Sequence, residues 1–243
     1  MRKFYFTLIF LLFIECKRNY EEIKLPTYVL WSALNSSYEP VEQIVFVDRF
    51  YNPEEQADLG LSDLDVRIKF LNSEYILKEK IVMDRDSDRY LVYSDSFYVP
   101  PGIECTLRVS FPNSENLKCI TNVPSDFNVI YPKNYDTVIV PSNDLLIWEK
   151  SFNSKLYTIY IRKNLSDSFL LFFSPDTFLD LFRRENVFKS EGFYEIYIRA
   201  ENEDIYHWNL NREDRIKEEW VKGVFGAYVE RFIKVYVKLK NET

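Results

Sequence analysis

Apolar and polar residues alternate along most of the chain after residue 27, which is the pattern of β-strands that bury one face. The segment DVRIKFLN is the strictest case, because Val66, Ile68 and Phe70 fall on one face and charged residues fall on the other. Short strands of this kind follow one another up to Pro124, at intervals of about 8–12 residues that are typical of β-sandwiches. We therefore predict a first β-sandwich module over residues 28–124.

The remainder of the chain, residues 125–243, shows the same alternation with helical interruptions. The sequence Ser-Pro-Asp at residues 174–176 is a typical helix start and predicts a helix over residues 175–186. Residues 205–211 (IYHWNLN) are expected to form a strand, the charged residues 211–222 a second short helix, and residues 223–239 a long hairpin or bent strand. The predicted fold class is mainly β, with two tandem antiparallel β-sandwich modules and one or two short helical insertions in the second.

The first sixteen residues have the pattern of an export signal. Arg2 and Lys3 precede an apolar run of residues 4–14, which is too short for a membrane-spanning helix of about 20 residues. Cys16 follows, and the chain then becomes polar. This order resembles a bacterial lipoprotein signal, which implies a signal peptide over residues 1–16, lipid attachment at Cys16 and a tether over residues 17–27. An ordinary cleaved signal and an uncleaved anchor are the alternatives.

Composition narrows the possible functions. Lys plus Arg number 31 against 38 for Asp plus Glu, so the net charge is −7 and no basic surplus is present to bind nucleic acid. A single histidine cannot build a multi-histidine zinc site, and five glycines leave no room for a glycine-rich phosphate loop. We expect a non-enzymatic protein without a cofactor.

Two cysteines lie in neighbouring predicted strands, ECTLRVSF and LKCITNV, which a turn at residues 112–115 joins. If Phe111 pairs with Asn116, alternation places Cys105 and Cys119 on opposite faces. A disulfide needs converging side chains, so both are expected to be free, buried thiols.

Four segments carry a family resemblance: GIECTLRVSFPNSENLKCITNVPSDFNVIYP, LLIWEKSFNSKLYTIYIRK, GFYEIYIRAENEDIYHW and KGVFGAYVERFIKVYV. In this order, behind a lipoprotein-like signal, they resemble Bacteroidetes-type outer-membrane lipoproteins of unknown function. The resemblance implies an immunoglobulin-like or carboxypeptidase-regulatory-like first module and a fibronectin type III-like second module. It also implies a cell-envelope location at the outer membrane, either periplasmic or surface-exposed. It implies no activity.

An acidic turn is the one candidate metal site. Asp84, Asp86 and Asp88 have the spacing that begins a calcium loop, but Arg89 stands where such a loop needs glycine. Asp and Ser also favour ordinary turns. We therefore expect a polar turn and keep these aspartates only as a weak metal candidate.

Aromatic side chains are the other candidates. Trp208 and Trp220 flank the charged insertion and are a possible contact surface, whereas Trp31 and Trp148 are expected in the core. His207, the lone histidine, is expected to be structural.

Two further motifs predict backbone geometry. Tyr194 fits a tyrosine corner, in which the phenol hydroxyl bonds back to the main chain. Gly223 and Gly226 are expected to mark a bend in the last strand, and a bulge or a close backbone approach is the alternative.

Taken together, the residues and the resemblance predict a non-catalytic, lipid-anchored cell-envelope protein with a binding or assembly role. An accessory role in an outer-membrane uptake complex is one form that we consider for this role. The expected partners are the membrane, through the lipid, and an envelope protein or a glycan. A surface glycan-binding module is the alternative. A carboxylate-based hydrolase and a purely structural spacer are the less favoured readings.

Overall fold

The computed structural model describes residues 28–49, 60–83, 89–112, 115–163, 168–184, 186–211 and 213–240. It is mainly β, as the alternation predicts. Before Pro124 the strands are β1 (Tyr28–Ser36), β2 (Val41–Arg49), β3 (Asp65–Phe70), β4 (Ser73–Met83), β5 (Arg89–Phe97), β6 (Glu104–Ser110) and β7 (Asn116–Asn122).

The later strands are β8 (Val129–Tyr131), β9 (Thr137–Val140), β10 (Leu146–Trp148), β11 (Leu156–Lys163), β12 (Leu170–Ser174), β13 (Phe178–Leu179), β14 (Gly192–Glu201) and β15 (Val221–Leu239). Most of them are short, and the three longer ones, β11, β14 and β15, belong to one large sheet. Helix α2 (Glu203–Asn211) is the only helix among the described residues.

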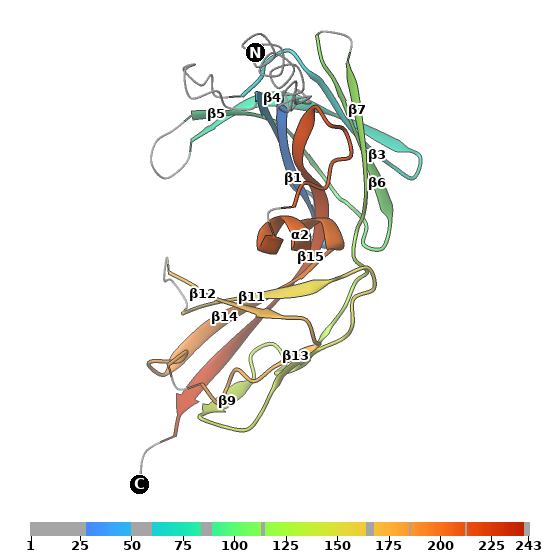
Figure 1. Cartoon of the computed structure of the whole chain (residues 1–243). Helices are drawn as coiled ribbons and strands as arrows, with labels where there is room; N and C mark the ends of the chain where they lie inside the picture. Colours follow the sequence, from blue (N-terminus) through green and yellow to red (C-terminus); the bar gives the residue numbers. More distant parts are fainter. Residues whose placement is uncertain are drawn as a thin grey trace, which may run out of the picture.

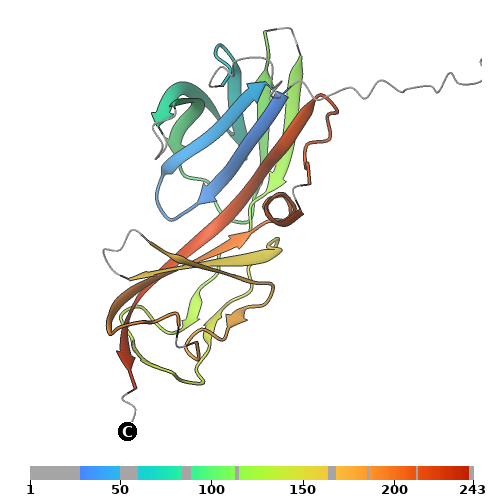
Figure 2. The same cartoon turned by 60° about the vertical axis from the view of Figure 1, so that its left-hand side comes forward.

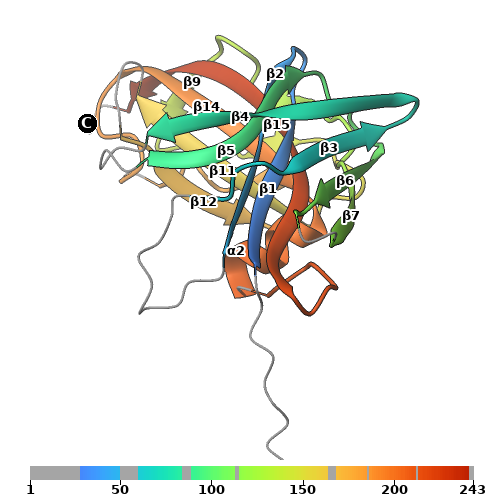
Figure 3. The ribbon, with the colours of Figure 1, turned by 90° about the horizontal axis from the view of Figure 1, so that it is seen from above.

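The strands before Pro124 form two facing layers, and β4 belongs to both. Its residues 73–77 pair with β3, whereas residues 78–83 pair with β5, so the strand crosses from one layer to the other (Figure 3). One layer contains β1, β2 and β5, and the other contains β3, β6 and β7. Val66, Ile68 and Phe70 are all buried between the layers, which confirms the face that the alternation predicts.

Strand β15 runs the length of the molecule and belongs to both halves (Figures 1 and 2). Its residues 221–229 pair in parallel with β1, and residues 228–237 pair antiparallel with β14. The predicted division at residue 124 assigns this whole strand to the second module. In the structure its first half instead completes the sheet of the first, so one hydrogen-bonded sheet continues through both halves.

The second half consists of a large sheet and a small one. The large sheet runs in the order β12-β11-β14-β15, with β9 also paired to β15, and the small sheet runs β13-β10-β8. Trp148 of β10 is 1% exposed and lies 5.2 Å, between ring centroids, from Tyr157 of β11. The expected core position of Trp148 is therefore confirmed, and the two sheets share a core.

The helix lies elsewhere than the sequence predicts. The described residues of 175–186 contain β13 and turns instead of a helix, and the hydroxyl of Ser174 donates to the carbonyl of Phe178 and accepts from the amide of Asp176. The predicted strand at residues 205–211 is α2, and the described part of residues 211–222 adds no second helix. The first turn of α2 is capped by the side-chain oxygen of Asn202, which accepts from the amide of Ile205, and Ile205 packs against Gly226 of β15.

The register between β6 and β7 differs by one residue from the prediction. Ser110 pairs with Asn116, so Cys105 and Cys119 lie on the same inward face. The prediction of opposite faces is wrong, whereas the prediction of free, buried thiols is confirmed. Burial raises the pKa of each thiol to about 12.

The predicted geometry at Tyr194 is confirmed, whereas one prediction of burial is wrong. The hydroxyl of Tyr194 donates to the carbonyl of Ser190 at 3.0 Å, as a tyrosine corner requires. Gly223 has a φ of +132° and faces the carbonyl of Leu30, which is the close backbone approach expected as the alternative to a bend. Trp31, expected in the core, is 41% exposed because it lies on the outer face of β1.

No helix in the described ranges has the length and apolar character needed to cross a bilayer.

Candidate functional site

Several of the predicted site residues lie outside the described ranges. Cys16 precedes residue 28, and Asp84, Asp86 and Asp88 fall between β4 and β5. Among the residues that the structure does describe, no group of three or more His, Cys, Asp or Glu side chains is arranged to hold a metal ion. Lipid attachment and the weak calcium candidate therefore stay as predictions.

The two candidate contact tryptophans occupy different settings. Trp220 is half-buried and packs edge-on against Phe111 and Tyr28, with ring centroids 5.4 Å and 5.9 Å away. Trp208 is also half-buried, on α2. Trp220 thus connects β1 with the end of β6. Trp208 and Trp220 therefore do not form one open aromatic surface.

His207 belongs to a local ion-pair network on α2. Its Nδ1 lies 2.8 Å from a carboxylate oxygen of Glu213, and its Nε2 lies 3.4 Å from Glu203. The start of the helix is fixed by Asn202, whose side-chain oxygen accepts from the amides of Ile205 and, at 3.3 Å, Ala227. The acidic residues of this insertion therefore orient a helix on β15, which agrees with a structural role for the histidine.

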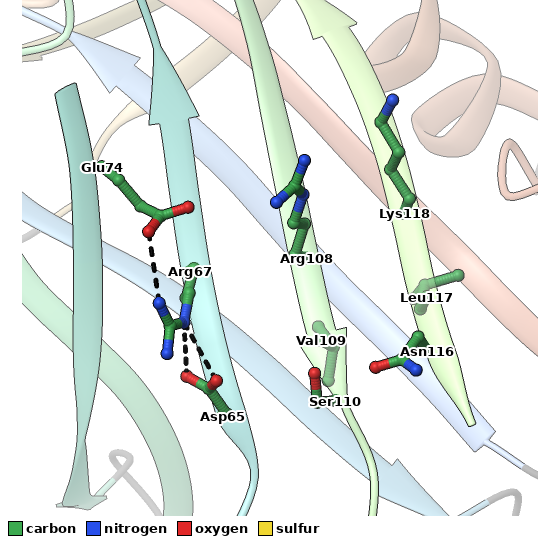
Figure 4. A pocket seen from close by; sticks show the side chains of 9 residues that line it. All are labelled: Asp65, Arg67, Glu74, Arg108, Val109, Ser110, Asn116, Leu117 and Lys118. Atoms are coloured by element: carbon green, nitrogen blue, oxygen red, sulfur yellow. Dashed lines mark hydrogen bonds and ion pairs between the residues drawn. The ribbon is translucent and has the colours of Figure 1, made fainter. Parts of the chain in front are cut away.

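A polar groove of about 440 Å³ lies on the outer face of β3, β6 and β7 (Figure 4). Arg67 is held there by both carboxylate oxygens of Asp65 at 2.9 Å and by Glu74 at 3.2 Å. Arg108 is the cross-strand neighbour of Arg67 on one side and of Lys118 on the other. The groove therefore combines a row of cationic side chains, Arg67, Arg108 and Lys118, with the carboxylates of Asp65 and Glu74, and this arrangement is suited to recognition of charged groups.

A second surface is formed by the outer side of β11, β14 and β15, and it carries aromatic rings, of which the two phenylalanines are exposed and the three tyrosines half-buried. We call it the aromatic face. Its members alternate with buried residues along each strand and are the following: Tyr160, Phe193, Tyr197, Phe232 and Tyr236.

Cross-strand register brings the rings of the aromatic face together. Tyr197 pairs with Phe232, with ring centroids 4.9 Å apart, and Phe193 pairs with Tyr236 at 5.2 Å. Phe193 is 41% exposed and Phe232 is 44% exposed. Contiguous exposed apolar surface of this kind marks interaction sites in folded proteins.

Charged side chains border the aromatic face on the same strands. The guanidinium of Arg199 lies 4.1 Å from the ring centroid of Tyr228 and 4.9 Å from that of Tyr160. It also bonds the carboxylate of Glu230 at 2.9 Å. These contacts fix the position of the arginine beside the rings, so the surface combines rigid aromatic area with an ordered ion pair, a composition enriched at protein interfaces.

Glu201 is the buried carboxyl group next to this ion pair. It is 2% exposed, and burial raises the pKa of its carboxyl above the usual value. Its Oε2 accepts from the side-chain amide of Asn209 on α2 at 3.4 Å. Because the carboxyl is covered, it is out of reach of a dissolved substrate, and its raised pKa belongs to the packing of α2 on the sheet.

The sequence contained a signal for the aromatic face that the strand assignments did not use. In KLYTIYIRK and GFYEIYIRAE the buried residues are mostly aliphatic or tyrosine, with Thr158 and Glu201 as buried polar members, and the alternate, outward-facing set also contains aromatic residues. Aromatic residues in the polar phase of an alternating strand indicate a functional outer face. The sequence could not indicate that three strands separated along the chain bring these residues together.

No family model matches the chain, and no curated protein matches it. A solved structure described as a cytokine receptor complex has a TM-score of 0.30 and 9% identity, over 84% of this chain and 94% of that one. The tandem Ig repeats of Dlar have a TM-score of 0.26 and 9% sequence identity, over 88% of this chain and 98% of that one. The fibronectin(III)-like modules of CbhA from Clostridium thermocellum have a TM-score of 0.22 and 9% identity, over 88% of this chain and 98% of that one. At such TM-scores the likeness carries no argument about function.

Proposed function

We propose that this protein is a non-catalytic, lipid-anchored cell-envelope protein that binds a partner protein through its aromatic face. The observation that carries the binding role is the group of solvent-facing rings on β11, β14 and β15, two of which are more than 40% exposed. Such rings supply a large contact area and lose little side-chain conformational entropy on binding. The adjacent ion pair of Arg199 and Glu230 would orient a bound partner.

The anchor is proposed to be Cys16, with residues 17–27 as the tether. Support comes from the apolar run before the cysteine and the polar sequence after it. Stable attachment requires more than one acyl chain, since a single chain binds membranes only weakly. The intact mass of the membrane-extracted protein tests this, and a lipidated chain beginning at Cys16 is expected. A Cys16→Ser variant should lose the mass increase, and a wild-type chain that keeps residues 1–15 would contradict the anchor.

The binding role is tested by site-specific photo-crosslinking in intact cells. A photoreactive side chain at Phe232 lies on the aromatic face, and one at Ile120 is the matched control. Ile120 is 49% exposed and lies on the outer face of β7, in the other half of the molecule. We expect a discrete protein adduct from position 232 and none from position 120. Equal labelling at both positions, or none at either, would contradict the proposal.

Glycan binding is the second candidate function. It required Trp208 and Trp220 to form an exposed aromatic surface, and the structure does not bring them together in that way. Trp220 is packed between Tyr28 and Phe111, which leaves little of its ring to stack on a sugar. Residues of the aromatic face would have to replace it. Binding of purified protein to envelope glycans that the double variant Phe193→Ser/Phe232→Ser abolishes would favour a glycan over a protein partner.

A further inference from the structure

Three cations lie side by side on the outer face of β3, β6 and β7. Arg67 is directly opposite Arg108, and Arg108 is directly opposite Lys118. Directly opposed side chains have Cβ atoms about 4.5–5.5 Å apart, and like charges in such positions destabilise a sheet. Because the whole chain has a net charge of −7, this row is a local concentration of positive charge on an acidic protein.

Only the first of these cations is neutralised by the protein itself. The guanidinium of Arg67 donates to Asp65 at 2.9 Å and to Glu74 at 3.2 Å (Figure 4). Arg108 and Lys118 are exposed, and in the part of the chain that the structure describes neither is paired with a carboxylate. The repulsion between these two cations is therefore uncompensated, and a bound anion would remove it.

The two unpaired cations line one groove of about 440 Å³, a volume within the range of about 300–1,000 Å³ that small-molecule sites occupy. Their charged ends extend away from Ser110 and towards the same end of the strands (Figure 4). A guanidinium presents a planar fork of N–H donors, and an ammonium adds a compact second charge. The pair therefore suits a ligand group that has several acceptor oxygens and more than one negative charge.

We propose that the groove binds a small dissolved phosphate monoester, with the phosphate group held between Arg108 and Lys118. A phosphate monoester carries a charge of about −1.5 to −2 near pH 7 and has three acceptor oxygens, so one group neutralises both cations. The fork of Arg108 binds two of the oxygens, and the ammonium of Lys118 binds the third. A single carboxylate has one charge and would leave one cation without a partner.

The neighbouring carboxylates restrict the ligand to a compact anion. Asp65 and Glu74 lie on the β3 side of the unpaired cations, with side chains that are 44% and 36% exposed. An anionic membrane surface or a nucleic acid would bring further negative charge against these carboxylates and against an acidic protein. A small phosphate monoester avoids this repulsion because it contacts only β6 and β7.

Binding is tested by isothermal titration calorimetry of the full-length protein in a neutral detergent, at low and constant ionic strength, with methyl phosphate as the probe. One site per chain is expected. Methyl sulfate, which has a single negative charge, should bind at least about tenfold more weakly. Arg108→Gln and Lys118→Gln should each weaken methyl phosphate binding at least about tenfold. Lys69→Gln is the matched control, because it removes an exposed cation of β3 that does not line the groove, and it should leave binding unchanged.

The ligand-free protein gives a second measurement. Because the opposed cations repel each other, Arg108→Gln should raise the Tm of the free protein by about 1–3 °C, whereas Lys69→Gln should not raise it. Methyl phosphate should raise the Tm of the wild type and leave that of Arg108→Gln unchanged. A lower Tm for free Arg108→Gln would show that the arginine is compensated within the protein, which would overturn the proposal.

Two binding results would also overturn it. One is a wild type that does not bind methyl phosphate, or that binds it no better than Arg108→Gln/Lys118→Gln does. The other is binding only to vesicles that contain phosphatidic acid, since the phosphate would then be recognised on a membrane surface. The groove and the aromatic face lie on different strands, and a small anion supplies no protein to crosslink at Ile120. Crosslinking from Phe232 therefore tests the proposed function separately.

Discussion

Arg231 on β15 bonds Asp126 in the segment that follows Pro124, with its Nε 2.8 Å from the carboxylate oxygen. The guanidinium also lies over the ring of Tyr38, in the turn between β1 and β2, at 3.9 Å from the centroid. The arginine side chain is 7% exposed, whereas that of Asp126 is 44% exposed. The side chain of Arg231 on β15 therefore joins the first half of the protein, at Tyr38, to the segment after Pro124 that leads into the second half.

This asymmetry of burial predicts unequal effects of mutation. Asp126→Ala leaves a buried cation without its carboxylate and should lower the free energy of unfolding by about 2 kcal/mol, a value reduced for the exposure of the aspartate. Arg231→Met removes the buried charge, keeps apolar volume beside Tyr38 and leaves a solvated carboxylate, so it should cost less. Urea denaturation of both variants measures the difference. A larger loss for the methionine variant would show that ring contact rather than charge pairing holds the junction.

Two glycines of β15 should respond differently to alanine. A Cβ at Gly223 would lie 1.8 Å from the carbonyl oxygen of Leu30, and its φ of +132° disfavours any side chain. Gly223→Ala should therefore cost about 3 kcal/mol or more. A Cβ at Gly226 would meet side-chain atoms, namely Cγ1 and Cδ1 of Ile205 at 2.5 Å and 2.6 Å and Oδ1 of Asn202 at 3.1 Å, and Gly226→Ala should cost about 1–2 kcal/mol.

Chemical denaturation of the two glycine variants tests this order. The double variant Gly226→Ala/Ile205→Ala relieves the contact and should be less destabilised than the sum of its two single variants. Additive losses would mean that α2 does not pack on Gly226 as described. No substitution of Leu30 is expected to rescue Gly223→Ala, because the obstacle there is a backbone carbonyl.

The two core thiols should be unreactive in the folded protein. Burial raises the pKa of Cys105 and Cys119 to about 12, and only the thiolate reacts rapidly. In a Cys16→Ser background, a thiol reagent at pH 8 should label neither cysteine until denaturant is added. Fast labelling of either cysteine under native conditions would contradict the buried placement.

The same shift gives a pH dependence of stability. Each thiol is held protonated by the folded state, whereas the unfolded chain releases its proton at lower pH, near the ordinary thiol pKa of about 8.5. Stability from these groups is therefore complete below that value and is lost as pH rises from there toward 12. Denaturation midpoints measured at pH 8 and at pH 10 should fall more for the wild type than for Cys105→Ala/Cys119→Ala.

Glu201 should oppose folding at neutral pH. Burial raises the pKa of its carboxyl, so the folded state prefers the protonated form. Stability is then greatest below the unfolded-state pKa and decreases as pH rises through the folded-state pKa. Glu201→Gln keeps an acceptor for Asn209 without the charge, and it should raise the Tm at pH 7 by about 2–4 °C.

Differential scanning calorimetry across pH tests the role of Glu201. The advantage of Glu201→Gln should shrink toward pH 4, where the wild-type carboxyl is protonated in both states. Glu230→Gln is the matched control, because Glu230 is on the neighbouring strand but is half-buried and bonds Arg199, and it should lower the Tm instead. An equal gain from Glu201→Gln at pH 4 and pH 7 would contradict a charge effect.

Local sequence determined much of this protein. Alternation alone identified the buried faces of the strands, as Val66, Ile68 and Phe70 show, because a side-chain period of two is a property of the extended backbone itself. Trp148 in the core and the hydroxyl bond of Tyr194 were also predictable, since each depends on residue type and immediate neighbours.

Tertiary structure decided the remainder. Residues 205–211 satisfy either a strand or a helix pattern, and in the folded protein they belong to α2, whose first turn is capped by Asn202 and whose Ile205 packs on Gly226 of the distant strand β15. The register that places both cysteines inward depends on a turn, which the alternation of two strands does not specify. β15 joins both halves, and the aromatic face unites three strands, because hydrogen bonding between strands distant in sequence assembles them. Alternation shows which residues face outward, but only the packed sheet determines which of them become neighbours.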